Sequence, residues 1–213
     1  MTKNIRIILF MLMTLLLVAS FFVLILQVPE IMRWNTDLFL WLNQFYWQPL
    51  AVSIALLEEL DVLIYVVLIC ILIYYKRHDL ALSIIIAIVI ETMFVSLLKQ
   101  AVALDRPFNV LNGVSAAYRP SDYSFPSGHA GRAFAALSVW CFREKKHYLA
   151  LLGLATLISI SRVYIGVHYP LDVIVGAIIG LLIGYSVARL DLKPLLMWLT
   201  GLYFKAKGRA NAN

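Results

Sequence analysis

Long apolar runs separated by short charged segments dominate the pattern of this chain. Six such runs cover residues 5–28, 50–75, 80–104, 128–142, 148–167 and 171–190. A helix that crosses a bilayer needs about 20 predominantly apolar residues. The pattern therefore predicts an all-α, polytopic membrane protein whose six transmembrane helices form a bundle.

The segments outside these runs also carry a pattern. Residues 34–48 place apolar side chains at helical spacing, which is typical of a short amphipathic helix in the membrane interface; they are Trp34, Leu38, Trp41, Leu42 and Phe45. Residues 107–126 form the longest polar stretch, which we expect to be a loop. Residues 192–213 are first apolar and then basic, and we expect a tail on the membrane surface.

Composition supports this prediction, because 62% of the 213 residues are hydrophobic and only 14% are charged. An average soluble domain is roughly 45–50% apolar and about 25% charged, so the soluble globular class is excluded. We see no internal repeat and expect a single domain over 1–213. The run 5–28 exceeds the 7–15 residues typical of a signal peptide, so we expect it to remain as an uncleaved anchor.

The distribution of basic residues predicts an orientation. The N-terminus through Arg6, the loops 76–79 and 143–147 and the C-terminal segment from Arg189 onward together hold 12 of the 18 lysines and arginines. Because cytoplasmic segments are enriched in these residues, we expect both termini to be cytoplasmic in a cell (inner or plasma) membrane. The regions 29–49, 105–127 and 168–170 then face the extracytoplasmic side. The net charge of +6 is explained by this topology, and we expect no nucleic-acid partner.

Polar residues suited to phosphate chemistry gather at the predicted outward helix ends. Lys99 precedes Arg106-Pro107 by seven residues, Pro126-Ser127-Gly128-His129 opens the fourth run, and Ser161-Arg162 is followed by His168 and Asp172. Guanidinium groups bind phosphate oxygens bidentately, and a lysine adds a compact charge. A Pro-Ser-Gly segment before a helix presents a hydroxyl and backbone N–H groups at the positive helix end, where an anion is stabilised. Ser127 can equally be a helix N-cap.

The two histidines extend this chemistry. A histidine can attack phosphorus or transfer a proton near neutral pH. A carboxylate four residues after His168 can orient its imidazole and stabilise the imidazolium, although Asp172 can also be a first-turn acid favoured by the helix dipole. His78 and His147 fall in predicted cytoplasmic loops, and we expect no role in catalysis for them.

These three motifs, in this order and spacing, resemble the signature of the type 2 phosphatidic acid phosphatase (PAP2) family, which includes small bacterial membrane lipid phosphatases. The resemblance implies a metal-independent reaction without a cofactor. His168 would be the nucleophile and form a phosphohistidine, Asp172 would orient it, and His129 would protonate the leaving oxygen. The phosphoryl oxygens would be held by Lys99, Arg106, Ser127, Gly128 and Arg162.

Several other polar residues lie outside the three motifs. Tyr118, Arg119 and Tyr123 in the polar loop are candidate headgroup contacts. The mid-run Glu91 is either a partner of the basic cluster or, as we favour, a protonated or paired residue inside the bundle. The cluster Glu58, Glu59 and Asp61 either balances the basic site or, as we favour, is solvated beyond a shorter apolar core over 62–75.

By this resemblance, the sequence predicts a phosphatase that acts on membrane lipids. Undecaprenyl or another polyprenyl diphosphate is the first candidate substrate, followed by phosphatidylglycerophosphate, phosphatidic acid and the phosphates of lipid A. Two alternatives remain open: a phosphotransferase that passes the phosphoryl group to another lipid, and a lipid or anion transporter that uses the same pocket. The pattern does not predict an oligomeric state.

Overall fold

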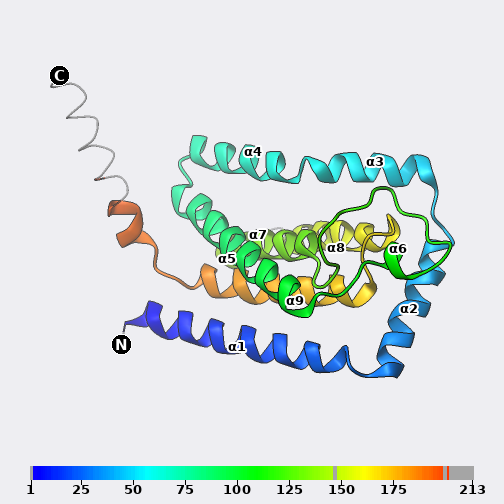
Figure 1. Ribbon diagram of the computed structural model, residues 1–213. Helices are drawn as coiled ribbons and strands as arrows, with labels where there is room; N and C mark the ends of the chain where they lie inside the picture. Colours follow the sequence, from blue (N-terminus) through cyan, green and yellow to red (C-terminus); the bar gives the residue numbers. More distant parts are fainter. Residues whose placement is uncertain (1, 146–147, 199–200, 202–213) are drawn as a thin grey trace, which may run out of the picture.

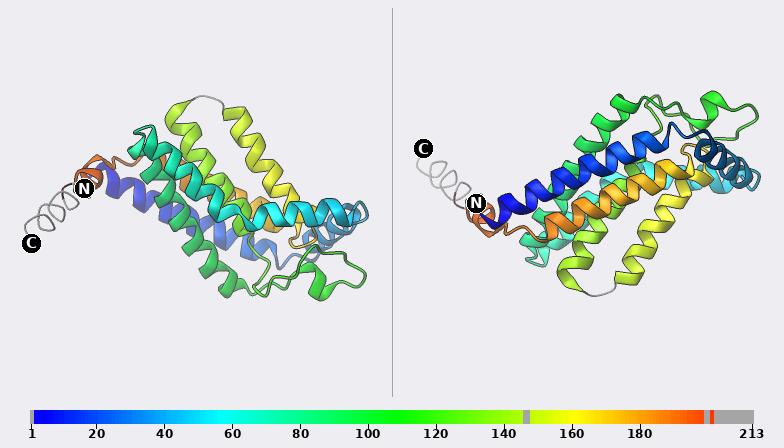
Figure 2. Two further views of the ribbon diagram at one scale, coloured as in Figure 1. Left: turned by 90° about the horizontal axis from the view of Figure 1, so that it is seen from above. Right: turned by 90° about the horizontal axis from the view of Figure 1, so that it is seen from below.

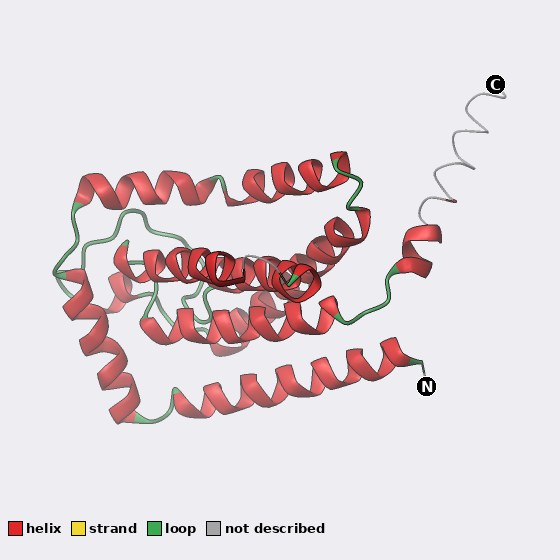
Figure 3. Cartoon of the chain, turned by 180° about the vertical axis from the view of Figure 1, so that it is seen from behind, coloured by secondary structure: helices red, strands yellow, loops and turns green. Residues whose placement is uncertain are grey.

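In the computed structural model, the described residues are 2–145, 148–198 and 201, and they contain helices but no strand (Figures 1 and 3). The helices are α1 (Lys3–Ile25), α2 (Pro29–Asn43), α3 (Gln48–Glu59), α4 (Asp61–Tyr74), α5 (His78–Val102), α6 (Pro107–Val110), α7 (Gly128–Glu144), α8 (Tyr148–Tyr164) and α9 (Pro170–Ala188). The predicted all-α class is confirmed. His147 and most of the predicted tail lie outside the described residues.

The arrangement is a bundle with α7 and α9 at its centre. Helix α7 packs most extensively on α9, and also on α5 and α8. Figure 1 shows α1 along one side of the bundle and α3 with α4 along the opposite side, while α2 crosses one end. The further views in Figure 2 show α7 and α8 running side by side.

Two predicted segments have different bounds in the structure. The amphipathic helix expected over 34–48 is α2, Pro29–Asn43, because Pro29 is suited to a first helical turn and starts the helix earlier. The run expected to span as 50–75 is divided at Leu60 into α3 and α4. Trp34 and Trp41 are exposed on α2, whereas Asn35 and Phe39 face the bundle.

The predicted number of spans is not confirmed by helix length. Within the described residues, three helices are long and apolar enough to cross a membrane: α1, α5 (extended to Val110) and α9. Shorter apolar helices lie in α3, α4 and α8. Large apolar side chains are exposed along α1 and α4, for example Leu17 and Val62. Such surfaces suit a lipid environment and would be unfavourable in water.

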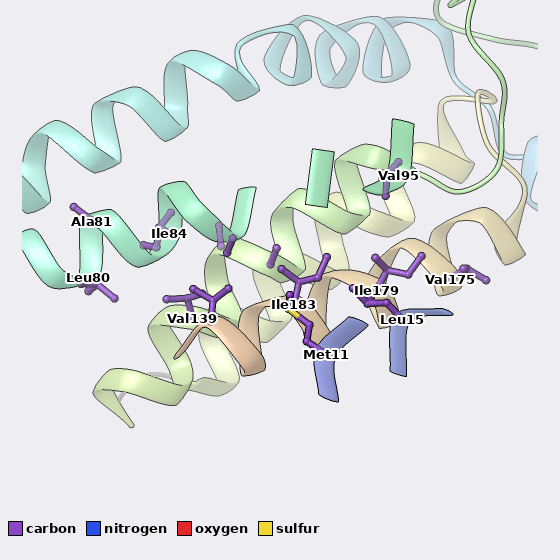
Figure 4. Packing of buried hydrophobic residues seen from close by; sticks show 14 of the residues in the cluster. Met11, Leu15, Leu80, Ala81, Ile84, Val95, Val139, Val175, Ile179 and Ile183 are labelled. Carbon is purple, nitrogen blue, oxygen red and sulfur yellow. The ribbon is translucent and has the colours of Figure 1, made fainter. Parts of the chain in front are cut away.

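The apolar core joins these central helices to α1 (Figure 4). Leu15 of α1, Ile84 of α5, Val139 of α7 and Ile183 of α9 all belong to one cluster of buried side chains. Helix α1 contributes Met11, Leu15 and Ala19 at every fourth position and leaves its other faces exposed. The core therefore attaches α1 through a single stripe.

Glycines let α7 and α9 approach unusually closely. A Cβ at Gly176 would collide with the carbonyl of Ser127, one at Gly180 with the carbonyl of Gly131, and one at Gly184 with the hydroxyl of Ser138. Small residues at every fourth position allow two membrane helices to bring their backbones together. This contact determines how near the first turns of the two helices lie to each other.

We predict opposite effects of the same substitution at two glycines. Gly180→Ala should destabilise the protein by about 1–3 kcal/mol, as expected for overpacking. Gly153→Ala on α8 meets no atom within 4 Å and should be neutral or stabilising by about 0.4–1 kcal/mol. Thermal unfolding of the purified proteins in detergent measures both. Equal transition temperatures for the two variants would contradict the close contact of α7 and α9.

Candidate active site

Five helix ends and one loop converge on a single cavity of about 210 Å³. Lys99 lies in the last turn of α5, Arg106 just before α6, His129 in the first turn of α7 and Arg162 in the last turn of α8, while His168 lies just before α9. All five line this cavity. The predicted gathering of the three sequence motifs at helix ends is therefore observed.

His168 lies deep in this cavity between a cation and a carboxylate. Its side chain is 2% exposed, with Nε2 3.3 Å from Nη1 of Arg106 and Nδ1 3.3 Å from Oδ2 of Asp172. Because a guanidinium can only donate, Nε2 is the unprotonated nitrogen, and Nδ1 carries the hydrogen and donates it to Asp172. The lone pair of Nε2 is thus directed at the basic residues of the cavity.

Burial lowers the pKa of His168 well below its ordinary value, and the positive charges of Arg106, Lys99 and Arg162 act in the same direction. The imidazole is therefore neutral at physiological pH. A neutral imidazole with its lone pair toward a cavity lined by Lys99, Arg106 and Arg162 has the form required of a nucleophile.

Asp172 is fully buried and has a local structural role as well. Its Oδ2 accepts hydrogen bonds from the backbone N–H of Tyr169, at 2.8 Å, and from the hydroxyl of Ser124, at 2.5 Å. Asp172 is thus both a first-turn acid of α9 and the partner of His168, so its two interpretations from the sequence are compatible. Ser124, which sequence reasoning missed, shares this carboxylate.

Arg106 connects the polar loop to His168. Its Nε donates to the carbonyl of Asp122 at 2.8 Å, and its Nη1 donates to the carbonyl of Val167 at 2.7 Å. Its Nη2 forms an ion pair of 2.6 Å with the carboxylate of Asp122. The guanidinium is therefore held in one orientation beside the imidazole.

Asp122 lies between two of the predicted phosphate-binding residues. Besides its contact with Arg106, its carboxylate is 2.8 Å from Nζ of Lys99. Partial burial raises the pKa of Asp122, but hydrogen bonds from Lys99 and Arg106 and their positive charges more than offset this and hold the pKa below its ordinary value. Asp122 belongs to none of the three motifs, so the sequence does not predict its place in the site.

The remaining predicted phosphate-binding residues, Arg162, Gly128 and Ser127, differ in their burial and contacts. Arg162 is fully buried and donates to the Tyr118 hydroxyl. Gly128 lines the cavity at the start of α7. Ser127 occupies the N-cap position of α7 without a side-chain cap bond, and its buried hydroxyl has no hydrogen-bond partner within the described residues. Ser127 is not among the residues that line the cavity.

Of the three predicted headgroup contacts, one lines the cavity and two do not. Tyr118 lines it, whereas Arg119 lies over the ring of Phe108, 5.4 Å from its centroid. The Tyr123 side chain is exposed, and its carbonyl accepts a hydrogen bond from Lys99. Among the residues that the structure describes, no group of three or more His, Cys, Asp or Glu side chains is placed to hold a metal ion.

The interpretation of Asp61 as a solvated residue is wrong. Its carboxylate forms an ion pair of 2.6 Å with Arg132 and lies 3.5 Å from Nε2 of His129. The side chains of Glu58 and Glu59 lie outside what the structure describes. Glu91 is fully buried on α5 and lies against Gly131 of α7, which agrees with its favoured placement inside the bundle.

Comparison with known proteins decides the family. The profile of the PAP2 superfamily matches residues 79–194, a segment that contains all three motifs and the whole cavity lining. The chain belongs to the PAP2 superfamily. The PAP2 match begins in α5 and ends beyond α9, so the four helices that precede α5 lie outside it.

Individual PAP2 proteins resemble this chain in sequence and in fold. An undecaprenyl-diphosphatase of Sulfolobus acidocaldarius is 34% identical over 123 residues, which cover 56% of this chain and 59% of that protein. The chain thus spans less than two thirds of the length of this relative.

Two solved PAP2 structures have a similar fold. The crystal structure of Aquifex aeolicus LpxE gives a TM-score of 0.65 at 32% identity, covering 72% of this chain and 94% of LpxE. A transmembrane PAP2-type phosphatidylglycerolphosphate phosphatase of Bacillus subtilis gives a TM-score of 0.66 at 22% identity, covering 88% of this chain and 94% of that one. With the apolar helices described above, these comparisons identify the chain as a helical membrane protein.

The environment of His168 in this PAP2 site leads to a prediction about its titration. The chain has four histidines. In NMR spectra of histidine-labelled protein, the signal that disappears in His168→Ala should remain that of a neutral imidazole well below pH 6.5. A base whose pKa is lowered takes up its proton only at lower pH, so protonation at or above pH 6.5 would contradict the buried, cation-lined environment.

Proposed function

We propose that this chain is an integral membrane lipid phosphatase that hydrolyses phosphate or diphosphate groups of membrane lipids through a phosphohistidine. The observation that carries this proposal is the geometry of His168, whose Nε2 is directed at Arg106 while Nδ1 is held by Asp172. Lys99 and Arg162 line the same cavity. A phosphoryl group bound by these cations would lie against the nucleophilic nitrogen.

The reaction has two steps. In the first, Nε2 of His168 attacks phosphorus, the bond from phosphorus to the leaving oxygen breaks, and His129 gives its proton to that oxygen. In the second, a water that transfers its proton to His129 attacks phosphorus, the P–N bond breaks, and inorganic phosphate leaves. Asp172 stabilises the positive charge on His168 while the phosphohistidine exists. Most of the acceleration in such reactions comes from positioning and charge stabilisation.

The phosphate-binding residues have different roles in this proposal. Lys99, Arg106 and Arg162 carry the charge that stabilises the phosphoryl oxygens, and the Gly128 N–H and the Ser127 hydroxyl complete the set at the positive end of α7. Tyr118 orients Arg162 through its hydroxyl. Neither a metal ion nor a cofactor takes part in either step.

The proposed first substrate is undecaprenyl diphosphate or another polyprenyl diphosphate. This choice is supported by the Sulfolobus relative, which is named an undecaprenyl-diphosphatase. The Bacillus protein of known structure is named a phosphatidylglycerolphosphate phosphatase, so phosphatidylglycerophosphate is the second substrate to test. We further propose a six-span topology with both termini cytoplasmic and the site on the extracytoplasmic side. The uneven distribution of basic residues supports this orientation.

We predict that purified protein releases inorganic phosphate from undecaprenyl diphosphate in detergent with a chelator present. His168→Ala should abolish turnover, and Arg162→Met should reduce kcat about 100-fold or more, as for the loss of one transition-state donor. A panel with phosphatidylglycerophosphate, phosphatidic acid and lipid A ranks the substrates. Full activity of His168→Ala would refute the mechanism, and phosphate transfer to an added acceptor lipid would identify a phosphotransferase.

We predict the orientation from cysteine labelling of intact cells. In a background without Cys70 and Cys141, which are free thiols, Ser121→Cys in the polar loop should react with a membrane-impermeant maleimide. His78→Cys at the other end of α5 should react only after lysis. Both native residues are exposed, so the reverse pattern would place the site on the cytoplasmic side.

A further inference from the structure

Asp61 is an acidic residue outside all three motifs that reaches the candidate general acid. Helix α4 begins at Asp61, directly after the break at Leu60. The Asp61 Oδ2 is 2.6 Å from Nη2 and 3.1 Å from Nε of Arg132, and 3.5 Å from Nε2 of His129. The division of the second apolar run thus places a carboxylate against the first turn of α7.

Asp61 has mostly apolar neighbours along its own helix. Asp61 is the only charged residue of α4, whose other positions are almost all apolar. Its side chain is 19% exposed. An acidic residue among such neighbours is costly and usually has a function. Arg132 follows His129 by one helical turn, and both line the cavity.

The charges explain what the carboxylate can do. To protonate a leaving oxygen, His129 must first carry a positive charge, and the neighbouring guanidinium of Arg132 opposes that charge. The negative charge of Asp61 offsets the positive charge of Arg132 and lies beside the His129 ring. The imidazolium of His129 therefore forms next to an ion pair and not next to an unpaired cation. A carboxylate at one ring nitrogen also restricts the orientation of the ring, as Asp172 does for His168.

We propose that Asp61 is a positioning residue that orients His129 and stabilises its protonated form, so that His129 can act as the general acid. The proposal rests on the proposed phosphatase function. During the first step the proton moves from the imidazolium of His129 to the leaving oxygen as the P–O bond breaks. Asp61 keeps its negative charge throughout and accepts no proton.

A dependence on the leaving group distinguishes this role from a structural ion pair between α4 and α7. A lipid alkoxide needs a proton to depart, whereas nitrophenolate departs without one. Loss of general acid catalysis typically costs about 10²–10⁴-fold, and it should affect only the first kind of substrate. A structural defect should lower turnover of both kinds together.

The experiment measures kcat and KM of the purified full chain with phosphatidic acid and with p-nitrophenyl phosphate. For Asp61→Asn we expect kcat/KM on phosphatidic acid to fall about 10- to 100-fold, within the range of general acid catalysis. KM on phosphatidic acid should change little, and kcat/KM on p-nitrophenyl phosphate should be retained. Asp61→Glu restores the carboxylate and should recover part of the loss. An equal loss on both substrates, or no loss, overturns the proposal.

Two further variants complete the design. Asp79→Asn removes a carboxylate that lies 3.4 Å from Arg143 at the opposite end of α7, and it should leave both activities unchanged. His129→Ala should show the same selectivity as Asp61→Asn in kcat/KM, with a larger loss, because kcat/KM covers only the steps up to departure of the leaving group. If His129→Ala shows no selectivity, the proposed mechanism itself fails. If His129→Ala is selective and Asp61→Asn is not, only the role of Asp61 fails.

Discussion

The close contact between α7 and α9 is the constraint on which the rest of the site depends. Gly176, Gly180 and Gly184 leave room for the backbone of α7 where any side chain would collide. At the end of this contact the backbone N–H of Ser127 donates to the carbonyl of Asp172 at 2.9 Å. The first turns of the two helices are therefore joined directly, so the positions of His129 and His168 follow from helix packing.

The polar loop completes the site because it supplies hydrogen-bond partners for buried charged groups. Without the loop, these groups would lack such partners. Arg106 uses its Nε and both terminal nitrogens to hold Asp122 and the carbonyl of Val167. Ser124 reaches the carboxylate of Asp172 from the same loop. Because buried charges are stable only when they are paired and hydrogen-bonded, this loop is as much a part of the site as the helix ends.

Much of this arrangement could be predicted from the sequence, and the exceptions have a physical reason. The all-helical class follows from the length of the apolar runs, and the gathering of Lys99, His129 and His168 follows from motifs placed at helix ends. The break at Leu60 lies inside the acidic cluster Glu58, Glu59 and Asp61. Glutamate and leucine are good helix formers, so the sequence alone does not distinguish this break from a continuous helix with a solvated end. The roles of Asp61 and Asp122 could not be predicted either, since each depends on a partner distant in the sequence.

The close approach of α7 and α9 could not be predicted from the sequence either. The sequence shows glycines at every fourth position of α9. It does not show which helix packs against them, so the close approach of the α7 backbone could not be inferred. Similarly, the choice between the two interpretations of Asp172 could not be made from spacing alone. Its carboxylate accepts from the Tyr169 amide and from His168 at once, which requires the bend before Pro170.

The carboxylate of Asp122 between Lys99 and Arg106 has a consequence for the binding of any anion at these two residues. An incoming phosphoryl group does not meet bare cations, because it must take the place of an anion that belongs to the protein. Binding is then an exchange, and the measured affinity is a difference between two sets of similar contacts. In the proposed reaction the same exchange would run backward when inorganic phosphate leaves, so a carboxylate that weakens the binding of substrate would also weaken the binding of product.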